Sequence, residues 1–291
     1  MIPLPRIRLS NRADGWRLRT ALKTWNLWTC LIMILDAHCQ LSYETTEEVA
    51  VIFMLRPRSG AAQIVLREDF LFVPQVPMVE FTDGYGNLCQ KAMMPVGKFQ
   101  VAVRYRVDVE NFIDVNPQAP LTRVQDLPPE VIQFLLPSRY CQSDQLAEMA
   151  QSIVGEVSPS YLQAQQIQNW VHQQIQYVVE SSDASTSALE TLQTRCGVCR
   201  DFAHLGIALC RAMSIPARMV VGFLYELRPM DLHAWFEAFI GGRWYTFDAT
   251  QAETKGNRIV IAFGRDAADV ALATIFGDFV LESMSVSVMA V

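Results

Sequence analysis

Residues 41–110 alternate between apolar and polar positions in short runs that are typical of β-strands. In the clearest run the apolar positions are Val101, Val103, Tyr105 and Val107. A period of two marks a strand with one buried face. A continuous apolar run at 49–55 and a glycine-rich turn at 83–87 belong to the same segment. Several strands without a helical period predict a small β-sandwich domain over residues 33–113.

The pattern changes at residues 114–130, which hold four prolines and no sustained period and are predicted to be a linker. Helical periods follow at 145–154 and 161–179. The apolar side of the second helix comprises Leu162, Ile167, Trp170, Val171 and Ile175, and its glutamines are expected to face out. Strand-like runs return from residue 217 onwards. Residues 131–291 are therefore predicted to form a second domain of the α+β class.

A third helix, beginning at Cys199, is predicted to be central and buried because it is apolar around most of its circumference. Its polar exceptions are Arg200, His204 and Arg211, which share one narrow stripe. Gly197 permits a tight turn into the helix, and Pro216 prevents its continuation. A cysteine in the first helical turn lies at the positive end of the helix dipole, which stabilises a thiolate.

The pair Cys196 and Cys199 has three possible interpretations. A thioredoxin-like redox pair needs a preceding strand, whereas residues 187–195 look helical or loop-like. A zinc site needs two more ligands, and neither a second CxxC pair nor a zinc-finger spacing of the four histidines is present. A single nucleophilic thiol at Cys199 needs a base and an orienting acid, with Cys196 as a structural bystander.

The base and the acid are predicted in a hairpin. Gly241 and Gly242 separate two aromatic-rich runs, which is a strong signal for a two-residue turn. If Ile240 pairs with Arg243, Trp235 faces Asp248 across the ribbon. His233 then lies diagonally from Asp248 on the same face, roughly 7–8 Å away at the backbone and within side-chain reach.

The two faces of this hairpin differ in chemistry. One carries core material, namely Ala234, Phe236, Ala238, Ile240, Tyr245 and Phe247. The other carries His233, Trp235, Glu237, Trp244, Thr246 and Asp248, a mixture more typical of a site. Glu237 lies further from His233 and is expected to have a supporting role at most. The two indoles either line a cleft or pack.

These residues fit thiol chemistry. A Cys199 thiolate attacks a carbonyl, the His233 imidazole pairs with it and later protonates the leaving amine, and Asp248 orients the imidazole. The Cys199 backbone N–H, at the helix start, is one expected donor to the oxyanion. The sequence does not identify the second donor.

Composition narrows the function classes. The chain of 291 residues has a formal net charge of −6 and no basic run in its body, which argues against nucleic acid or an anionic membrane surface as a partner. Seven scattered cysteines do not form a disulfide framework, so a reducing, cytoplasmic location is expected.

Residues 1–32 differ from the rest because they carry six basic residues and a single acidic one before an apolar run at 27–35. This resembles a signal peptide, but no small-residue cleavage site follows and the run is too short to span a bilayer. We expect an extension outside the domains, with Met33 as the favoured true start.

At this point the chain resembles the bacterial transglutaminase-like superfamily of cysteine proteases. The matching segments are 186–192, 197–218 and 231–250, and residue 214 is a serine where the family usually has a glycine. The resemblance implies a papain-like core, with a central helix packed on an antiparallel sheet, preceded by a small β-sandwich.

By that resemblance Cys199 is the nucleophile, His233 the base and Asp248 the orienting acid. The first expectation is a thiol-dependent amidohydrolase, a cysteine peptidase acting on peptide or isopeptide bonds of a peptide or protein substrate. An acyltransferase with the same triad and a non-catalytic binding module remain alternatives. No metal or organic cofactor is required, and the oligomeric state stays open.

Overall fold

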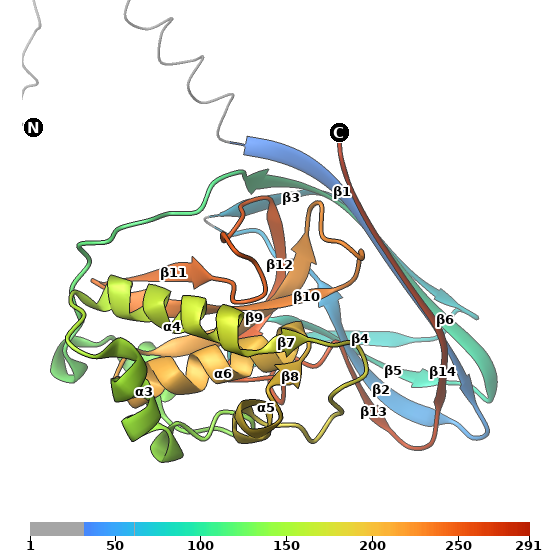
Figure 1. Cartoon of the computed structure of the whole chain (residues 1–291). Coiled ribbons are helices and arrows are strands. Elements are labelled where there is room, and N and C mark those ends of the chain that lie inside the picture. Colours follow the sequence, from blue (N-terminus) through green and yellow to red (C-terminus); the bar gives the residue numbers. More distant parts are fainter. Residues whose placement is uncertain (1–31, 61) are drawn as a thin grey trace, which may run out of the picture.

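The computed structural model describes residues 32–60 and 62–291, so the expected extension at 1–32 lies almost entirely outside the described residues. Helices cover one face of a four-stranded sheet, and two further four-stranded sheets lie beside this layer (Figure 1). The molecule is therefore of the α+β class, as the sequence predicts.

The strand-rich region is a sandwich of two antiparallel sheets. Its strands are β1 (Ile32–Thr45), β2 (Val49–Arg56), β3 (Gln63–Val73), β4 (Met78–Thr82), β5 (Leu88–Met94), β6 (Gly97–Glu110), β13 (Ala273–Phe276) and β14 (Val280–Ala290). One sheet has the order β14-β1-β6-β3 and the other β13-β2-β5-β4. Phe53 of β2 packs against Phe72 and Phe99 of the opposite sheet, with ring centroids 5.8 and 6.4 Å apart. Apolar residues at every second position thus bury one face of each sheet.

The boundary predicted for the second domain does not hold at its C-terminal end. Residues 131–291 were expected to form one core, but β14 pairs with β1 and β13 pairs with β2. The last two strands therefore complete the sandwich of the N-terminal region. The period of two at residues 280–290 marks a strand, but it carries no information about which sheet edge accepts that strand.

The remaining chain forms the helical layer and its sheet. The elements are η1 (Val124–Asp126), α2 (Pro129–Ile132), η2 (Gln133–Leu135), η3 (Ser143–Gln145), α3 (Ala147–Val154), α4 (Ser160–Gln174), β7 (Gln176–Tyr177), α5 (Ala188–Thr194), β8 (Cys196–Gly197), α6 (Cys199–Ala212), β9 (Ala217–Leu224), β10 (His233–Ile240), β11 (Arg243–Phe247) and β12 (Arg258–Gly264). The sheet order is β11-β10-β9-β12.

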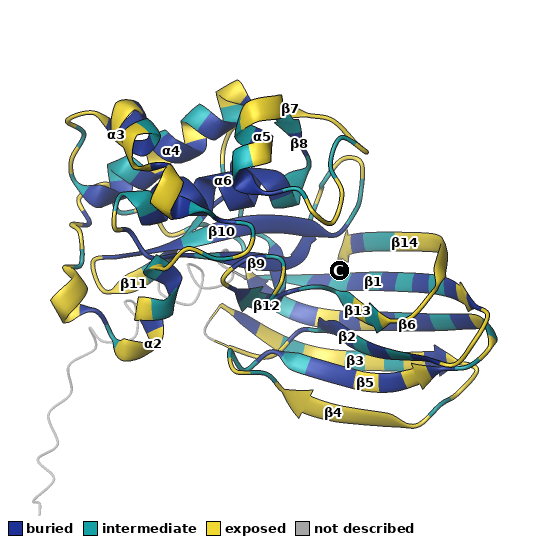
Figure 2. Cartoon of the chain, turned by 90° about the horizontal axis from the view of Figure 1, so that it is seen from below, coloured by how far each residue is buried: buried dark blue, intermediate teal, exposed yellow. Residues whose placement is uncertain are grey.

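Helix α6 is the centre of this layer, and Figure 2 shows it buried against β10. The packing is close because Gly206 faces the ring of Phe236, where an added Cβ would approach to 2.6 Å. Two residues of the predicted polar stripe, His204 and Arg211, are buried, and Arg200 is half-buried. His204 is fully buried and stacks on Tyr140, while the Arg211 guanidinium donates to the backbone carbonyls of Leu136, Ala217 and Arg265. The Arg211 guanidinium is thus hydrogen-bonded inside the core, and the Ala267 N–H donates to the His204 Nε2 at 3.1 Å.

The start of α6 is held by a side chain of its own first turn. The Val198 backbone N–H donates to the Asp201 carboxylate at 2.8 Å, and Ser182 also donates to that carboxylate. An acidic group in the first turn satisfies free N–H groups and favours the helix dipole. Gly197 is needed because an added Cβ would lie 2.7 Å from the Asp201 Cβ, so close approach, rather than an unusual turn, explains this glycine.

The sandwich is tied to the helical layer by side-chain amides. The Gln63 amide donates to the Val260 carbonyl at 2.8 Å and accepts from the Val260 N–H at 2.7 Å. Asn87 makes the same two bonds with Phe263. Both partners lie on β12, so the sandwich braces that strand.

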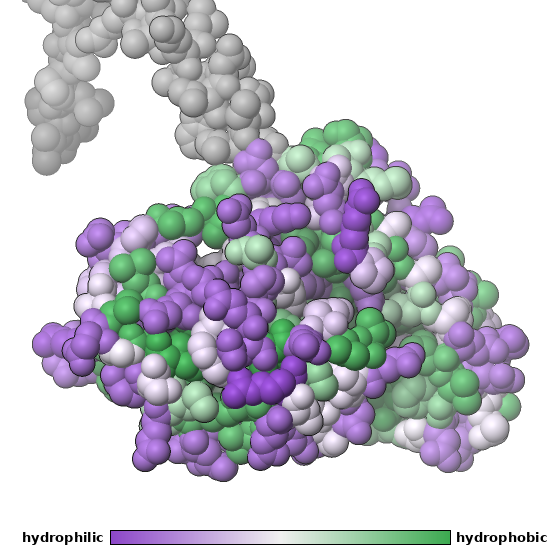
Figure 3. Space-filling view, viewed as in Figure 1, coloured by the Kyte–Doolittle hydropathy of each residue, from purple (hydrophilic) through white to green (hydrophobic). Residues whose placement is uncertain are grey.

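Among the described residues, no helix is long and apolar enough to cross a membrane. On the face drawn in Figure 3, polar and apolar side chains are interspersed.

Ser214 follows α6 in a left-handed conformation, with φ of 58°. The Ile215 N–H donates to the Cys210 carbonyl and the Ser214 N–H to the Arg211 carbonyl, the pattern of a helix end that prefers glycine. We expect Ser214→Gly to raise the free energy of unfolding by about 0.5–1 kcal/mol, because glycine adopts positive φ without steric cost. Urea denaturation measures the change.

The matched control is Ser152→Gly, an exposed position inside α3, which should destabilise the protein because glycine is a poor helix former. Equal destabilisation by both substitutions would contradict the interpretation of Ser214.

Candidate active site

The three residues singled out from the sequence lie at the ends of three elements. Cys199 is the first residue of α6, His233 is the first residue of β10, and Asp248 directly follows β11. The hairpin has the predicted register, with Ile240 opposite Arg243 and Phe236 opposite Phe247. The turn and the period of two thus bring the histidine and the aspartate together.

The side chains form a chain of hydrogen bonds. The His233 Nε2 and the Asp248 Oδ2 are 2.7 Å apart, and the Cys199 thiol is hydrogen-bonded to the same imidazole. Because Nε2 faces the carboxylate, the ring presents Nδ1 to the thiol. Cys199 is half-buried, whereas His233 and Asp248 are almost completely shielded from solvent. The arrangement offers a thiol at the surface, backed by a buried base and acid.

Asp248 has more partners than the sequence indicated. Its carboxylate accepts from the Arg258 guanidinium at 2.7 Å and from the Thr250 hydroxyl at 2.6 Å. Its backbone N–H donates to the Gln168 side-chain oxygen at 3.1 Å. A buried carboxylate is stable only when it is paired and hydrogen-bonded, and these contacts meet that need.

The sequence analysis did not identify Arg258 as a partner of Asp248, and it predicted the wrong orientation for Gln168. The glutamines of α4 were expected to face out, but Gln168 is buried and also accepts from the Thr254 hydroxyl at 3.0 Å. The available signal was a glutamine one helical turn from Ala164, on the same side as Ile167 and Val171. Arg258 lies at the start of the apolar strand β12, where nothing in the local pattern points to Asp248.

The site shifts the ionisation of both buried groups. Burial opposes protonation of His233, but its hydrogen bonds to Asp248 and Cys199 outweigh burial and raise its pKa to about 9. Burial also opposes ionisation of Asp248, yet the positive charge of Arg258 and the hydrogen bond from His233 hold its pKa below the usual range. The imidazolium and the carboxylate are therefore the stable forms at neutral pH.

On the second face of the hairpin, His233, Trp235 and Asp248 are buried, whereas Glu237, Trp244 and Thr246 are half-buried. Trp235 is 1% exposed and stacks near His233, and the Arg258 guanidinium lies 4.7 Å from its ring centroid. Glu237 forms an ion pair with Arg218 at 2.6 Å. Trp244 packs edge-on against Phe239. Together with the sandwich, this face lines a cavity of about 450 Å³.

The remaining cysteines do not form a metal or disulfide site among the described residues. Cys196 and Cys199 are both free thiols, and no group of three His, Cys, Asp or Glu side chains is arranged to hold a metal ion there. Cys210 is fully buried in α6, and burial raises the pKa of its thiol. These facts leave Cys199 as the half-exposed thiol that has a histidine partner.

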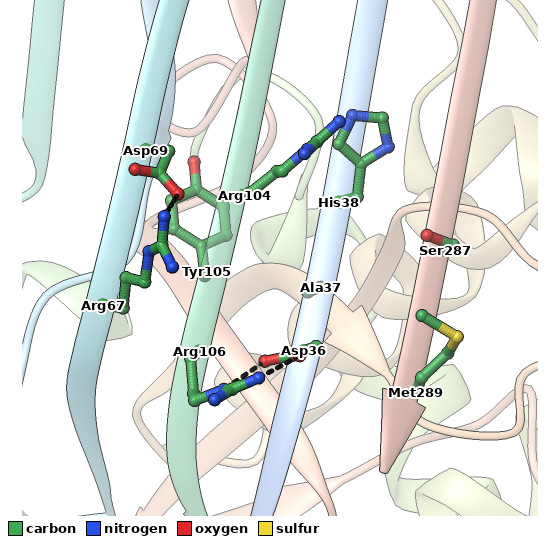
Figure 4. A pocket seen from close by; sticks show the side chains of 10 residues that line it. All are labelled: Asp36, Ala37, His38, Arg67, Asp69, Arg104, Tyr105, Arg106, Ser287 and Met289. Atoms are coloured by element: carbon green, nitrogen blue, oxygen red, sulfur yellow. Dashed lines mark hydrogen bonds and ion pairs between the residues drawn. The ribbon is translucent and has the colours of Figure 1, made fainter. Parts of the chain in front are cut away.

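A second cavity, of about 380 Å³, lies on the outer face of the sheet β14-β1-β6-β3 (Figure 4). Its charged side chains largely pair with one another, as Arg106 does with Asp36 and Arg67 with Asp69. Arg104 lies beside His38 and contributes to lowering the pKa of that imidazole, after burial. This cavity shares no residue with the candidate active site.

The chain is similar to a known protein family and to a solved structure. The family model described as the transglutaminase-like superfamily matches residues 147–249. The crystal structure of a candidate cysteine protease from Cytophaga hutchinsonii is similar over 89% of this chain and 91% of that chain, with 37% sequence identity and a TM-score of 0.84.

Two mycobacterial proteins without an assigned function are also similar. A Mycobacterium leprae protein is 35% identical over 111 residues, which cover 35% of this chain but only 39% of that relative. A Mycobacterium tuberculosis protein is 27% identical over 221 residues, which cover 65% of this chain and 68% of that protein.

Replacing Asp248 with asparagine tests the electrostatics of the site. We expect the pKa of His233 to fall from about 9 to its ordinary value of 6.5 or below, because burial then acts without the carboxylate. NMR titration of the imidazole protons measures this value. The matched control is Glu237→Gln, which should leave the pKa unchanged.

The same shift predicts how stability depends on pH. The pKa of His233 is raised on folding, so its contribution is fully present below pH 6.5 and is lost as pH rises through about 9. As the pH rises from 6.5 to about 9, the free energy of unfolding of the Asp248→Asn protein should fall less than that of the wild type. A parallel fall in both proteins would contradict the assignment.

Proposed function

The chain belongs to the transglutaminase-like superfamily, and on that basis we propose that it is a thiol-dependent amidohydrolase. In this proposal it is a cysteine peptidase that cleaves peptide or isopeptide bonds through Cys199, His233 and Asp248. The observation that carries the proposal is the continuous hydrogen-bonded chain from the half-exposed thiol to the buried carboxylate.

The first half of the reaction is acylation. The Cys199 thiolate attacks the amide carbonyl carbon, forming a C–S bond while the carbonyl π electrons move to oxygen. When the carbonyl re-forms, the C–N bond breaks and the leaving nitrogen takes a proton from the His233 imidazolium. Asp248 holds the imidazole in the required orientation and tautomer, through its bond to Nε2.

The second half is deacylation. The neutral His233 imidazole accepts a proton from water, and the resulting hydroxide adds to the thioester carbonyl. Collapse of this adduct expels the Cys199 thiolate and restores the ion pair with the imidazolium. If an amine takes the place of water, the same steps give acyl transfer.

The charge arrangement argues against a non-catalytic binding module. Enclosing Asp248 and Arg258 in the protein has a desolvation cost that their attraction barely offsets, and packed apolar residues are often at least as stable. In a binding module, the desolvation cost of this buried ion pair beside a free thiol would bring no benefit. An enzyme gains an oriented base.

Alkylation with iodoacetamide followed by peptide mapping tests the thiol–imidazole pair. At pH 6.5 we expect labelling of Cys199 at least about 10-fold faster than that of the other cysteines, because an ordinary thiol with a pKa of about 8.5 is almost entirely protonated there. His233→Ala should abolish this advantage. Cys196→Ser is the matched control and should leave it intact; preferential labelling of Cys196 would refute the proposal.

A library of peptide amides and isopeptides tests whether water or an amine accepts the acyl group. Products are identified by mass spectrometry with and without an added primary amine. Hydrolysis predicts release of the free acid at a rate that the amine leaves unchanged. Diversion of the product to the amide of the added amine would show that acyl transfer is the reaction. Cys199→Ala should abolish both products.

A further inference from the structure

The cavity of about 450 Å³ lies where the sandwich meets the face of the sheet β11-β10-β9-β12 that carries Trp235. Its wall includes Gln63 from the sandwich and Trp235 and Phe263 from the sheet, whereas the three triad residues do not line it. A cavity of this volume is large enough for a small organic molecule, and ligand sites occur preferentially between domains. The cavity is therefore a candidate binding site that is separate from the triad.

One part of the wall is apolar. The Arg218 guanidinium lies over the rings of Trp244 and Phe263, 4.1 and 3.9 Å from their centroids. The same guanidinium is held by its ion pair with Glu237 at 2.6 Å. Phe112 also lines the cavity, and its 42% exposed surface places it toward solvent. This part of the wall suits an aromatic or aliphatic group.

Three polar side chains of the wall have an atom without a hydrogen-bond partner among the described residues. These buried atoms are the Trp235 Nε1, the Arg258 Nη1 and the Asn257 Oδ1. The Arg258 guanidinium carbon is 4.7 Å from the Trp235 ring centroid, and Asn257 directly precedes Arg258 in the chain, so the three groups are neighbours. Buried polar groups are rarely left unpaired, because each unpaired group costs free energy. Two donors and one acceptor match an amide, whose carbonyl oxygen accepts and whose N–H donates.

The charges of the wall are balanced. It carries as many guanidinium groups as carboxylates, namely Arg58, Arg218 and Arg258 against Glu110, Asp114 and Glu237. A charged ligand would bring an unbalanced charge into a partly enclosed space, which is costly. The wall therefore favours an uncharged ligand.

We propose that this cavity binds an uncharged amide that carries an aromatic or aliphatic substituent. The amide oxygen accepts from the Trp235 Nε1 and the Arg258 Nη1, and the amide N–H donates to the Asn257 Oδ1. The substituent packs against Trp244 and Phe263.

The acceptor side of this site is held in place by the backbone. The Asn257 N–H donates to the Glu110 carbonyl at 3.0 Å, and the Asn257 carbonyl accepts from the Tyr225 N–H at 3.1 Å. On the donor side, the Arg258 Nη2 donates to Asp248 at 2.7 Å. The occupant of the cavity therefore shares this guanidinium with the triad.

Calorimetric titration of the full chain with three matched probes tests the ligand class. The probes are 3-phenylpropanamide, methyl 3-phenylpropanoate and 3-phenylpropanoate. The Cys199→Ala protein is used so that no probe is turned over. We expect the amide to bind at least about 10-fold more tightly than the other two, because the ester lacks the N–H and the carboxylate adds a charge. The NMR signal of the Trp235 Nε1–H should shift when the amide binds.

Substitutions in the Cys199→Ala background test the location. Ala62→Trp changes an exposed residue of the wall and should abolish amide binding by filling the cavity. Ala147→Trp, at an exposed position of α3, is the matched control and should leave binding unchanged. Asn257 has a positive φ of 57°, which glycine adopts without strain. Asn257→Gly should therefore weaken amide binding about 10-fold and leave ester binding unchanged.

Amide binding that survives Ala62→Trp would overturn the inference, because the probe would then lie outside the cavity. Equal affinities for the amide and the ester, or tighter binding of the carboxylate, would also overturn it, as would undetectable binding of the amide. An Asn257→Gly protein that still prefers the amide would remove the assigned acceptor and with it the proposed recognition. Absence of amide hydrolysis by the wild type, with the expected binding results, would reject the proposed hydrolase and retain this site.

Discussion

The structure depends on the burial of one negative charge. Asp248 has no exposed surface, so its carboxylate must find its partners within the protein. Arg258 and His233 each contact the same carboxylate oxygen at 2.7 Å. These contacts join the end of β11 to the starts of β10 and β12, so the geometry of the candidate site and the packing of the sheet cannot vary independently.

The β-sandwich also helps to hold the buried carboxylate, through hydrogen bonds to β12 that lie at a distance from the thiol. Gln63 binds both backbone groups of Val260, two residues beyond Arg258, and the Asn257 N–H donates to the Glu110 carbonyl. The start of β12 is therefore held from the sandwich side while Arg258 holds Asp248. We interpret the sandwich as a support that keeps Asp248 in place, and the similarity to the Cytophaga hutchinsonii protein extends over both regions.

Helix α6 supplies the other half of the arrangement. It is buried by Phe236 and its neighbours on β10, while Asp201 satisfies the N–H of Val198 at its start. A helix fixed in this way presents Cys199 to the imidazole with little freedom to move.

The sequence by itself determined the local parts of this site. The glycine pair and the period of two set the register that brings His233 to Asp248, and the apolar circumference of α6 placed Cys199 at the start of a buried helix. Residue 214 is a serine where the family usually has a glycine, and its backbone has the positive φ that favours glycine. In each case the information lies within one element or one hairpin.

Tertiary structure alone decided the partners that come from separate elements. Arg258 and Gln168 reach Asp248 from a strand and a helix, and no local sequence period predicts these contacts. The same holds for β14, which pairs with β1 from the opposite end of the chain. A strand pattern specifies which face is buried, whereas the choice of a neighbour depends on the packing of the whole molecule.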